Sequence, residues 1–305
     1  MVDSNIKAVL EKQGYRLVGS HSAVKVCAWT RKSLVDKGVC YKQQFYGIEC
    51  HRCLQMTPAV SWCTQKCLFC WRNTEQTIGT KLDNVDKPAD IIDGAIAAQK
   101  KLLTGFGGLS ADKVNKQKYL EAQKPNQAAI SLSGEPTIYP YIGELIEEFD
   151  NRGFTTFLVT NGTLPERLTN LKKLPTQLYL SIDAPNEKTY DRVCNPLSRG
   201  NWEKLNETIN LFPSLNTRKV VRITAVKDLN MADPEGYAKL LTTAEPDYIE
   251  IKSYMFIGSS RKRLTFENMP SFPEIQSFSE KIAQLTGYKI KDYKRDSRVV
   301  LLSKK

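Results

Sequence analysis

The stretch SWCTQKCLFCWRN, residues Ser61 to Asn73, holds three cysteines that are separated by three and then by two residues. They are Cys63, Cys67 and Cys70, and neither a fourth cysteine nor a histidine follows at once. Three thiolates can each bind one iron of a 4Fe-4S cluster, so the fourth iron lacks a protein ligand and can bind a substrate or cofactor. Zinc is the main alternative at such spacings, although it takes four ligands and the chain has only two histidines. The third possibility is that these are three unrelated buried cysteines that bind no metal.

The length and composition of the chain indicate a globular protein. A chain of 305 residues with 41% hydrophobic content can bury the core of one large α/β domain or of two small ones. No apolar run is long enough to cross a bilayer and the first residues contain no apolar signal region, so we predict a cytoplasmic protein without a membrane segment. A net charge of +11 favours an anionic partner such as nucleic acid, without deciding the question.

Most of the eight cysteines lie early in the chain. Seven of them fall between Cys27 and Cys70. In a reducing compartment, a clustered set of cysteines in a chain of this size indicates metal binding rather than a disulfide framework. The isolated Cys194 is expected to be an ordinary thiol.

Short apolar runs rich in β-forming residues alternate with helical segments through most of the chain. Strands are expected at residues 55–61, 127–132, 155–159, 177–182, 220–226 and 248–252. Helices are expected at residues 89–103, 141–151, 165–173, 202–211, 234–243 and 273–286. Such alternation predicts a parallel sheet with covering helices. Six βα units suffice for a partial (βα)6 TIM-like barrel and are too few for a closed eight-fold one.

The pattern also suggests a division of the chain into three parts. Residues 1–54 read as an N-terminal extension with one amphipathic helix at 5–13, residues 55–260 as the barrel core, and residues 261–305 as a basic C-terminal extension packed on the barrel. In parallel barrels, functional residues collect on loops after the carboxyl ends of the strands. The cysteine motif follows the first expected strand and therefore occupies such a loop.

The motif and its place in the chain resemble the radical S-adenosylmethionine enzymes. Their CxxxCxxC motif has an aromatic residue before the last cysteine, as Phe69 is here. SLSGEPT at 131–137 is similar to the GGEP segment of that family, with Ser133 in place of the first glycine. VTNGT at 159–163 and SIDAP at 181–185 follow the next two strands. Each of these segments alone is an ordinary turn or strand end, but together they stand in the family's order.

The resemblance implies a cofactor and a reaction type. In the family, the open iron binds the amino and carboxylate groups of S-adenosylmethionine, and one electron cleaves this cofactor to methionine and a 5'-deoxyadenosyl radical. The barrel positions the radical and excludes water. The resemblance implies contacts to the methionine amino group, the ribose and the carboxylate of the cofactor from Ser133, Gly134, Glu135, Asn161, Ser181, Asp183 and Arg222.

The early cysteines narrow the resemblance to one group of radical enzymes. Cys27, Cys40 and Cys53 are each separated by twelve residues, and with the segment CYKQQFYGIECHRC they resemble the 4-demethylwyosine synthases of wybutosine synthesis. The resemblance covers nearly the whole chain and implies a second 4Fe-4S cluster on these three cysteines. Cys50 forms a CxxC pair with Cys53, and spacing alone cannot decide between the two.

The same resemblance implies the substrates. In that family a two-carbon fragment of pyruvate is condensed with N1-methylguanosine at position 37 of phenylalanine tRNA, and a lysine shortly after the middle cysteine forms a Schiff base with pyruvate. Lys42 occupies that place. A lysine amine attacks a ketone only in its neutral form, so this role would need burial or a neighbouring cationic group. Without the resemblance, Lys42 would be read as a solvated surface residue.

The resemblance also bears on the electron source. Eukaryotic members of the family carry an N-terminal flavodoxin-like domain that supplies electrons. We expect no such domain here, because the chain resembles the short archaeal-type form. It implies an external electron donor of flavodoxin or ferredoxin type, and we expect a monomer.

Three basic segments are candidates for binding the anticodon arm of a tRNA. They are residues 289–305 with seven Lys or Arg against two Asp, residues 258–263, and the insertion lysines Lys100, Lys101, Lys113, Lys116, Lys118 and Lys124. Such side chains bind phosphate without reading sequence. Trp62, Trp71 and Tyr254 could stack on an unstacked base, although aromatic residues beside strands usually belong to the core.

Two other functions stay open. The chain could be a radical S-adenosylmethionine enzyme that acts on a protein or a small molecule, with an incidental basic surface. It could also be a zinc-stabilised RNA-binding module, which would be colourless and free of iron. The ordered βα repeat with cofactor-type motifs after successive strands argues against the zinc module.

Overall fold

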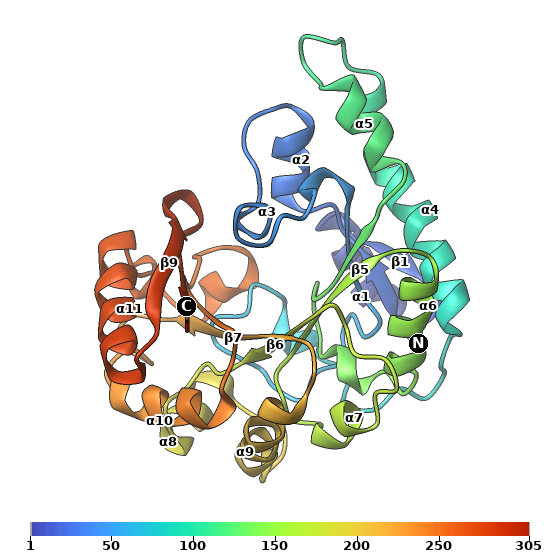
Figure 1. Ribbon diagram of the computed structural model, residues 1–305. Coiled ribbons are helices and arrows are strands. Elements are labelled where there is room, and N and C mark those ends of the chain that lie inside the picture. The colour runs from blue at the N-terminus through green and yellow to red at the C-terminus, as the bar shows by residue number, and fades with distance from the viewer. Residues whose placement is uncertain (1, 305) are drawn as a thin grey trace. The chain divides into compact units, whose positions relative to one another are not determined.

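The computed structural model describes residues 2–304, so Lys305 of the expected basic tail lies outside the described residues. The chain forms two compact units (Figure 1). The first unit holds the chain up to Trp62 together with Ile78–Val159 and Leu171–Thr176. The second holds Cys63–Thr77, Thr160–Asn170 and the chain from Gln177 onward. No helix within residues 2–304 is long and apolar enough to cross a membrane.

The first unit is built on a mixed sheet in the order β1-β2-β3-β4-β5. These strands are β1 (Arg16–Val18), β2 (Ser22–Val24), β3 (Cys53–Thr57), β4 (Gln127–Ile130) and β5 (Thr155–Thr160). The two short strands β1 and β2 run antiparallel to their neighbours, whereas β3, β4 and β5 are parallel. Met56, Ile130 and Leu158 lie side by side across the parallel strands and are fully buried. Parallel strands are covered on both faces, which explains their continuous apolar runs.

Six α-helices belong to the described residues of the first unit. They are α1 (Ser4–Lys12), α2 (Ala28–Leu34), α3 (Tyr41–Tyr46), α4 (Pro88–Gly107), α5 (Lys116–Ala122) and α6 (Ile142–Asn151). Local sequence explains several of their ends, because Asp3 accepts hydrogen bonds from two backbone N–H groups at the start of α1 and Pro88 begins α4. Buried Ile91, Ala95 and Leu103 recur at helical spacing along one face of α4.

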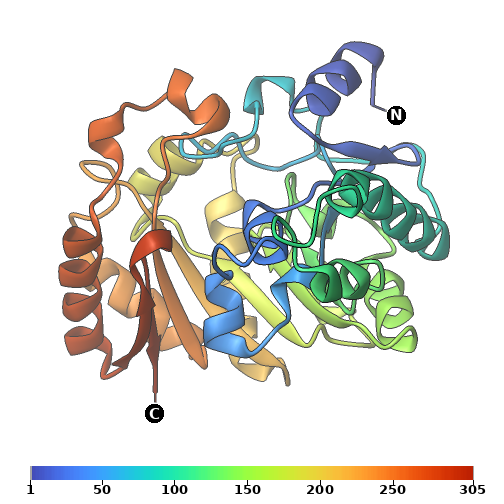
Figure 2. The same ribbon diagram turned by 90° about the horizontal axis from the view of Figure 1, so that it is seen from above.

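The second unit also contains three parallel strands, which two antiparallel strands extend. β6 (Gln177–Ser181), β7 (Arg218–Ala225) and β8 (Tyr248–Ser253) are parallel, and β10 (Val299–Ser303) pairs antiparallel with both β8 and β9 (Lys289–Lys294). Its helices are α7 (Pro165–Thr169), α8 (Glu187–Cys194), α9 (Asn201–Leu211), α10 (Pro234–Ala244) and α11 (Phe272–Thr286). α11 lies beside the β9–β10 hairpin in both views (Figures 1 and 2).

The expected elements are confirmed, although several boundaries differ, and the helix expected at 89–103 extends to Gly107. The first strand of the expected barrel is Cys53–Thr57 instead of 55–61, because Pro58 has no N–H group to continue the ladder. The helix expected at 165–173 ends at Thr169. The sequence did not lead us to expect the short strands β1 and β2, the helices α2, α3, α5 and α8, or the β9–β10 hairpin.

Gly134 offers a test of the turn that follows β4. Its φ is +72°, and a Cβ atom there would lie 1.8 Å from the carbonyl oxygen of Ala59 and 2.5 Å from that of Trp62. Since both obstacles are backbone atoms, Gly134→Ala should lower the free energy of unfolding by about 3 kcal/mol or more. Gly153 has a φ of +77° with open space around it, so Gly153→Ala should cost only about 1 kcal/mol. Urea unfolding of both variants measures the difference, and equal losses would contradict this account.

Candidate active site

Cys63, Cys67 and Cys70 lie in the second unit around a buried positive charge. Cys63 is buried and the other two are half-buried. Arg72 is only 4% exposed. Burial lowers the pKa of Arg72, but the neighbouring Cys63, Cys70 and Cys67 raise this pKa by more, so the guanidinium stays charged. A fixed cation beside three thiols favours their thiolate forms, which are the forms that bind iron.

Arg263 fixes the backbone of this cysteine loop. Its Nε donates to the carbonyl oxygen of Leu68 at 3.1 Å, and its Nη2 donates to the carbonyl oxygens of Cys70 and, at 3.2 Å, Arg72. Its Nη1 donates to a carboxylate oxygen of Glu75 at 3.0 Å. A planar guanidinium suits several acceptors held at fixed angles. Sequence reasoning did not single out Arg72 or Arg263. Arg72 could have been noticed because it lies two residues after Cys70, whereas no sequence signal pointed to Arg263.

A second segment runs antiparallel to the cysteine loop. The N–H groups of Lys66 and Leu68 donate to the carbonyl oxygens of Asn195 and Val193 at 3.0 and 2.9 Å. These two hydrogen bonds bring the end of α8 beside the motif, so Cys194 is buried next to Cys67. A hydrogen bond with Cys194, together with burial, raises the pKa of the Cys67 thiol.

Four residues expected to bind S-adenosylmethionine lie in the same unit. Asn161 donates from Nδ2 to the hydroxyl of Thr64 at 2.8 Å and thereby ties the loop after β5 to the cysteine motif. Ser181, at the end of β6, is paired with Arg222 on β7. These residues stand at or near the carboxyl ends of parallel strands, where barrels of this kind place their functional groups.

Asp183 is the one of these four residues whose carboxyl group has a strongly raised pKa. It is buried, and its carboxylate accepts a hydrogen bond from the N–H of Thr224 at 2.7 Å. Burial raises the pKa of Asp183 to about 6, and the Thr224 hydrogen bond and the charge of Arg222 oppose the rise. A buried carboxylate with a shifted pKa beside a guanidinium is typical of a binding site.

The SGEP segment lies in the first unit and packs on the chain ahead of Cys63. The hydroxyl of Ser133 donates to the carbonyl oxygen of Val60 at 2.8 Å, and the N–H of Glu135 donates to that of Trp62 at 2.8 Å. Gly134 makes this close approach possible, because a Cβ atom there would collide with the carbonyl oxygens of Ala59 and Trp62. The hydroxyl that replaces the glycine of the GGEP segment therefore stabilises the turn.

The early cysteines occupy the starts of three elements in the first unit. Cys27 and Cys40 stand at the N-caps of α2 and α3, yet neither side chain makes a capping hydrogen bond. Cys53 begins β3. Burial, and next the charge of Cys27, raise the pKa of Cys40 to about 12 and raise that of Cys53 as well. The charge of Lys42 opposes this rise and favours the thiolate forms that bind iron, so the donor set fits a metal cluster.

Lys42 follows Cys40 in the first turn of α3. Its side chain is buried, and its Nζ lies 5.2 Å from the ring centroid of Phe157. Its charge acts on both Cys40 and Cys53. The structure thus brings the expected Schiff-base lysine beside the expected cluster ligands, with 9% of the residue exposed.

Cys50 lies near these cysteines, and its sulfur atom takes part in a hydrogen bond with the backbone. It is buried in the short turn η1 (Cys50–Arg52), and its Sγ accepts a hydrogen bond from the N–H of Cys40 at 3.5 Å. Its own N–H donates to the side chain of Gln43 at 3.1 Å. Cys50 therefore ties the turn to the start of α3.

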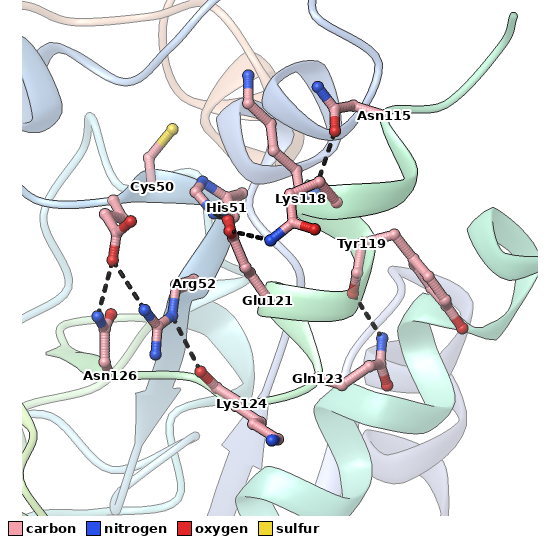
Figure 3. Close-up of polar contacts among 12 residues, drawn as sticks. Cys50, His51, Arg52, Asn115, Lys118, Tyr119, Glu121, Gln123, Lys124 and Asn126 are labelled. Carbon is pink, nitrogen blue, oxygen red and sulfur yellow. Dashed lines mark hydrogen bonds and ion pairs between the residues drawn. The ribbon is translucent and has the colours of Figure 1, made fainter. Parts of the chain in front are cut away.

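Helix α5 holds this turn in place (Figure 3). His51 bonds through Nε2 to a carboxylate oxygen of Glu121 at 2.6 Å, and Arg52 donates from Nε to the carbonyl oxygen of Lys124 at 3.1 Å. The carboxylate of Glu49 accepts from Arg52 and from Asn126. Glu49, His51 and Glu121 bring ligand-type atoms within 4.8 Å of one another, but protein donors already satisfy them.

The basic segments are only partly available to a partner. Arg261 and Lys262 are exposed, whereas Arg263 is turned into the cysteine loop. In the insertion, Lys118 pairs with Asp36 at 2.6 Å and Lys116 donates to backbone carbonyls. The hairpin strand β9 is largely exposed.

The candidate stacking residues belong mostly to the interior. Trp62 and Tyr254 are buried, in agreement with the core reading, and Trp71 is half-buried.

Comparison with known proteins agrees with this geometry. Residues 58–241 match the family model of the Radical SAM superfamily, and residues 243–304 match the family model described as Wyosine base formation. The S-adenosyl-L-methionine-dependent tRNA 4-demethylwyosine synthase of Pyrococcus horikoshii is 52% identical, over 97% of this chain and 88% of the relative. The enzyme of that name from Methanocaldococcus jannaschii is 39% identical, over 99% and 96%.

A solved structure of TYW1 with a lysine-pyruvate adduct bound has a TM-score of 0.91 and 39% identity, and the match covers 100% of this chain and 97% of that one. The fold class is therefore the expected one, an α/β partial (βα)6 TIM-like barrel of the radical S-adenosylmethionine type. The zinc-module reading is wrong. The chain belongs to the family of S-adenosyl-L-methionine-dependent tRNA 4-demethylwyosine synthases, which are radical S-adenosylmethionine enzymes.

Proposed function

We propose that this protein condenses a two-carbon unit of pyruvate with N1-methylguanosine at position 37 of tRNA(Phe), giving 4-demethylwyosine in the wybutosine pathway. The observation that carries the proposal is the placement of Lys42. It is a buried lysine in the first turn of α3, which begins just after Cys40, in a chain that belongs to the 4-demethylwyosine synthase family. A related structure holds a lysine-pyruvate adduct.

Cys63, Cys67 and Cys70 would hold the first 4Fe-4S cluster. When bound with S-adenosylmethionine, this cluster supplies a 5'-deoxyadenosyl radical. Arg72 compensates the charge of the thiolates, and Arg263 fixes the loop backbone. Ser133, Gly134, Glu135, Asn161, Ser181, Asp183 and Arg222 would bind the cofactor, as the family resemblance implies.

Cys27, Cys40 and Cys53 would hold a second 4Fe-4S cluster. Two of these cysteines stand at N-caps and make no capping hydrogen bond through their side chains, so no helix start would lose a cap if they bound iron. Cys50 is already engaged as an acceptor for the N–H of Cys40, which favours Cys53 as the third ligand. This cluster would offer its open iron to pyruvate.

Lys42 would bind pyruvate as a Schiff base. Its neutral amine attacks the keto carbon, a carbon–nitrogen double bond forms, and the keto oxygen leaves as water. Burial beside Phe157 limits the access of bulk water, which would hydrolyse this adduct.

The remaining parts of the proposal concern partners and organisation. Exposed basic residues of β9 and of the segment 258–263 would position the anticodon arm, so binding would weaken as salt rises. An external donor of flavodoxin or ferredoxin type would supply electrons to a monomeric, cytoplasmic enzyme. Residues 1–54 would serve the second cluster, 55–260 the radical chemistry and 261–305 the tRNA.

The test of this function is an assay of base formation. Anaerobically reconstituted protein is incubated with S-adenosylmethionine, dithionite, pyruvate and tRNA(Phe) carrying N1-methylguanosine at position 37. We expect the tricyclic base in the tRNA digest, and none with the unmethylated transcript. A protein that cleaves S-adenosylmethionine yet leaves the methylated tRNA unchanged would overturn the proposal.

Lys42→Ala should separate cofactor cleavage from base formation. Reductive cleavage of S-adenosylmethionine without tRNA should be unchanged, while base formation falls by about 1,000-fold or more, because the nucleophile for pyruvate is gone. Borohydride should trap labelled pyruvate on the wild-type protein and on Lys37→Ala, an exposed-lysine control from the same unit. Equal trapping on Lys42→Ala would show that another amine is modified.

Iron content should distinguish Cys53 from Cys50. Reconstituted wild-type protein should hold about eight irons per chain, and Cys53→Ala about four, because one cluster loses a ligand. Cys50→Ser retains a hydrogen-bond acceptor for the Cys40 N–H and should keep about eight irons. Loss of iron from Cys50→Ser with full retention in Cys53→Ala would reverse the assignment.

Arg263 should be needed for the first cluster although it touches only the backbone of the loop. Arg263→Lys keeps the charge but cannot reach the carbonyl oxygens of Leu68, Cys70 and Arg72 together, so reconstituted iron should fall toward about four per chain. Lys262→Ala removes an exposed charge from the neighbouring position and should leave iron unchanged. Iron and sulfide analysis decides, and a fully loaded Arg263→Lys would refute the clamp.

A further inference from the structure

We propose that Gln65 is a positioning residue for the first cluster, donating a side-chain hydrogen bond to the ligand sulfur of Cys67 while Tyr190 holds the amide in that orientation. This bond would raise the reduction potential of the cluster. The proposal rests on the proposed role of Cys67 as an iron ligand. It concerns the residue between the first two cysteines of the motif and its buried partner on α8.

The backbone around Gln65 is fixed on both sides. Thr64 accepts a hydrogen bond at its carbonyl oxygen from the N–H of Leu197 at 2.9 Å and another from the side chain of Asn201 at 3.2 Å. The N–H of Lys66 donates to Asn195 at 3.0 Å, and Gln65 forms a bridge with Pro196. These hydrogen bonds hold the backbone at Gln65 in place and so fix the direction in which its side chain points.

The side-chain amide of Gln65 has two hydrogen-bond partners. Gln65 is only 4% exposed; its Nε2 donates to the hydroxyl oxygen of Tyr190 at 2.7 Å, and its Oε1 accepts from the Sγ of Cys67 at 3.2 Å. Tyr190 is itself buried and packs on Trp202, with ring centroids 5.4 Å apart. The amide is thus enclosed between one phenol and one cysteine sulfur.

Binding of iron changes which atom can donate. A cysteine that ligates iron has lost its proton, so the sulfur of Cys67 can then only accept a hydrogen bond. The amide oxygen of Gln65 would face this sulfur without a proton between them. Rotation of the amide by half a turn removes the conflict, because Oε1 and Nε2 exchange places in nearly the same space. Nε2 then donates to Cys67, and the phenol of Tyr190, which can donate as well as accept, donates to Oε1.

The reoriented amide would favour the reduced cluster. Reduction adds one electron from the external low-potential donor, so the reduced form carries one more negative charge. A hydrogen bond to a ligand sulfur stabilises that charge, and such bonds are among the features that set the potential of iron–sulfur clusters. The Gln65–Tyr190 pair would therefore ease electron entry without touching S-adenosylmethionine.

An EPR-monitored potentiometric titration of reconstituted protein tests the proposal. The signal of the first cluster is identified as the one that S-adenosylmethionine perturbs. Gln65→Met has a similar length and no N–H donor, and we expect at least a tenfold lower ratio of reduced to oxidised cluster at a fixed potential, which is a shift of 59 mV or more for one electron. Gln76→Met makes the same chemical change elsewhere in this unit and should leave the potential unchanged.

Tyr190→Phe provides a second arm that does not depend on the folding of Gln65→Met. It leaves the amide in place but removes the phenol that orients it, so its potential should shift in the same direction by a smaller amount. An unchanged potential in Gln65→Met with full iron, or in Tyr190→Phe if Gln65→Met loses iron, would overturn the proposal. Neither result bears on base formation with excess dithionite, so failure of the proposed function is recognised separately.

Discussion

Thiolates that bind iron must be gathered in a small, partly dry space, and each one opposes the ionisation of its neighbours. Burial adds to the cost, because it removes water from every negative charge. Burial, and next the charge of Cys27, raise the pKa values of Cys40 and Cys53 in this way. Bound iron stabilises the thiolate forms, and the rest of the structure must offset the remaining cost of gathering these side chains.

The two cysteine sets meet this constraint in different ways. The first set lies within one short loop, and the buried Arg72 places a positive charge among its members. Arg263 and an antiparallel ribbon hold the loop backbone, so its shape does not depend on the sulfur atoms alone. The second set is spread over the starts of α2, α3 and β3 and has Lys42 as its neighbouring positive charge.

Sequence reasoning predicted the parallel strands, most of the helices and the family, because these depend on local periodicity and on contiguous motifs. It did not predict β1, β2 or the β9–β10 hairpin, whose short or charged strands are stabilised by pairing with distant segments. It also read Arg263 as part of a surface cluster, since the sequence alone does not show that a residue so far along the chain returns to Leu68 and Cys70. Cys194 was taken for an isolated thiol for the same reason.

The spacing of the early cysteines explains why the Lys-rich insertion carries more than charge. Twelve residues between ligands leave each cysteine on a separate element, so local structure cannot bring the three together. Helix α5 supplies the missing connection: Glu121 holds His51 in the turn before Cys53, while Lys118 pairs with Asp36 just beyond α2. Val114 and Ala122 pack with Val26 and Leu34 in one apolar cluster that supports Cys27. A segment that reads as a solvated basic insertion is thus the scaffold on which the second cysteine set depends.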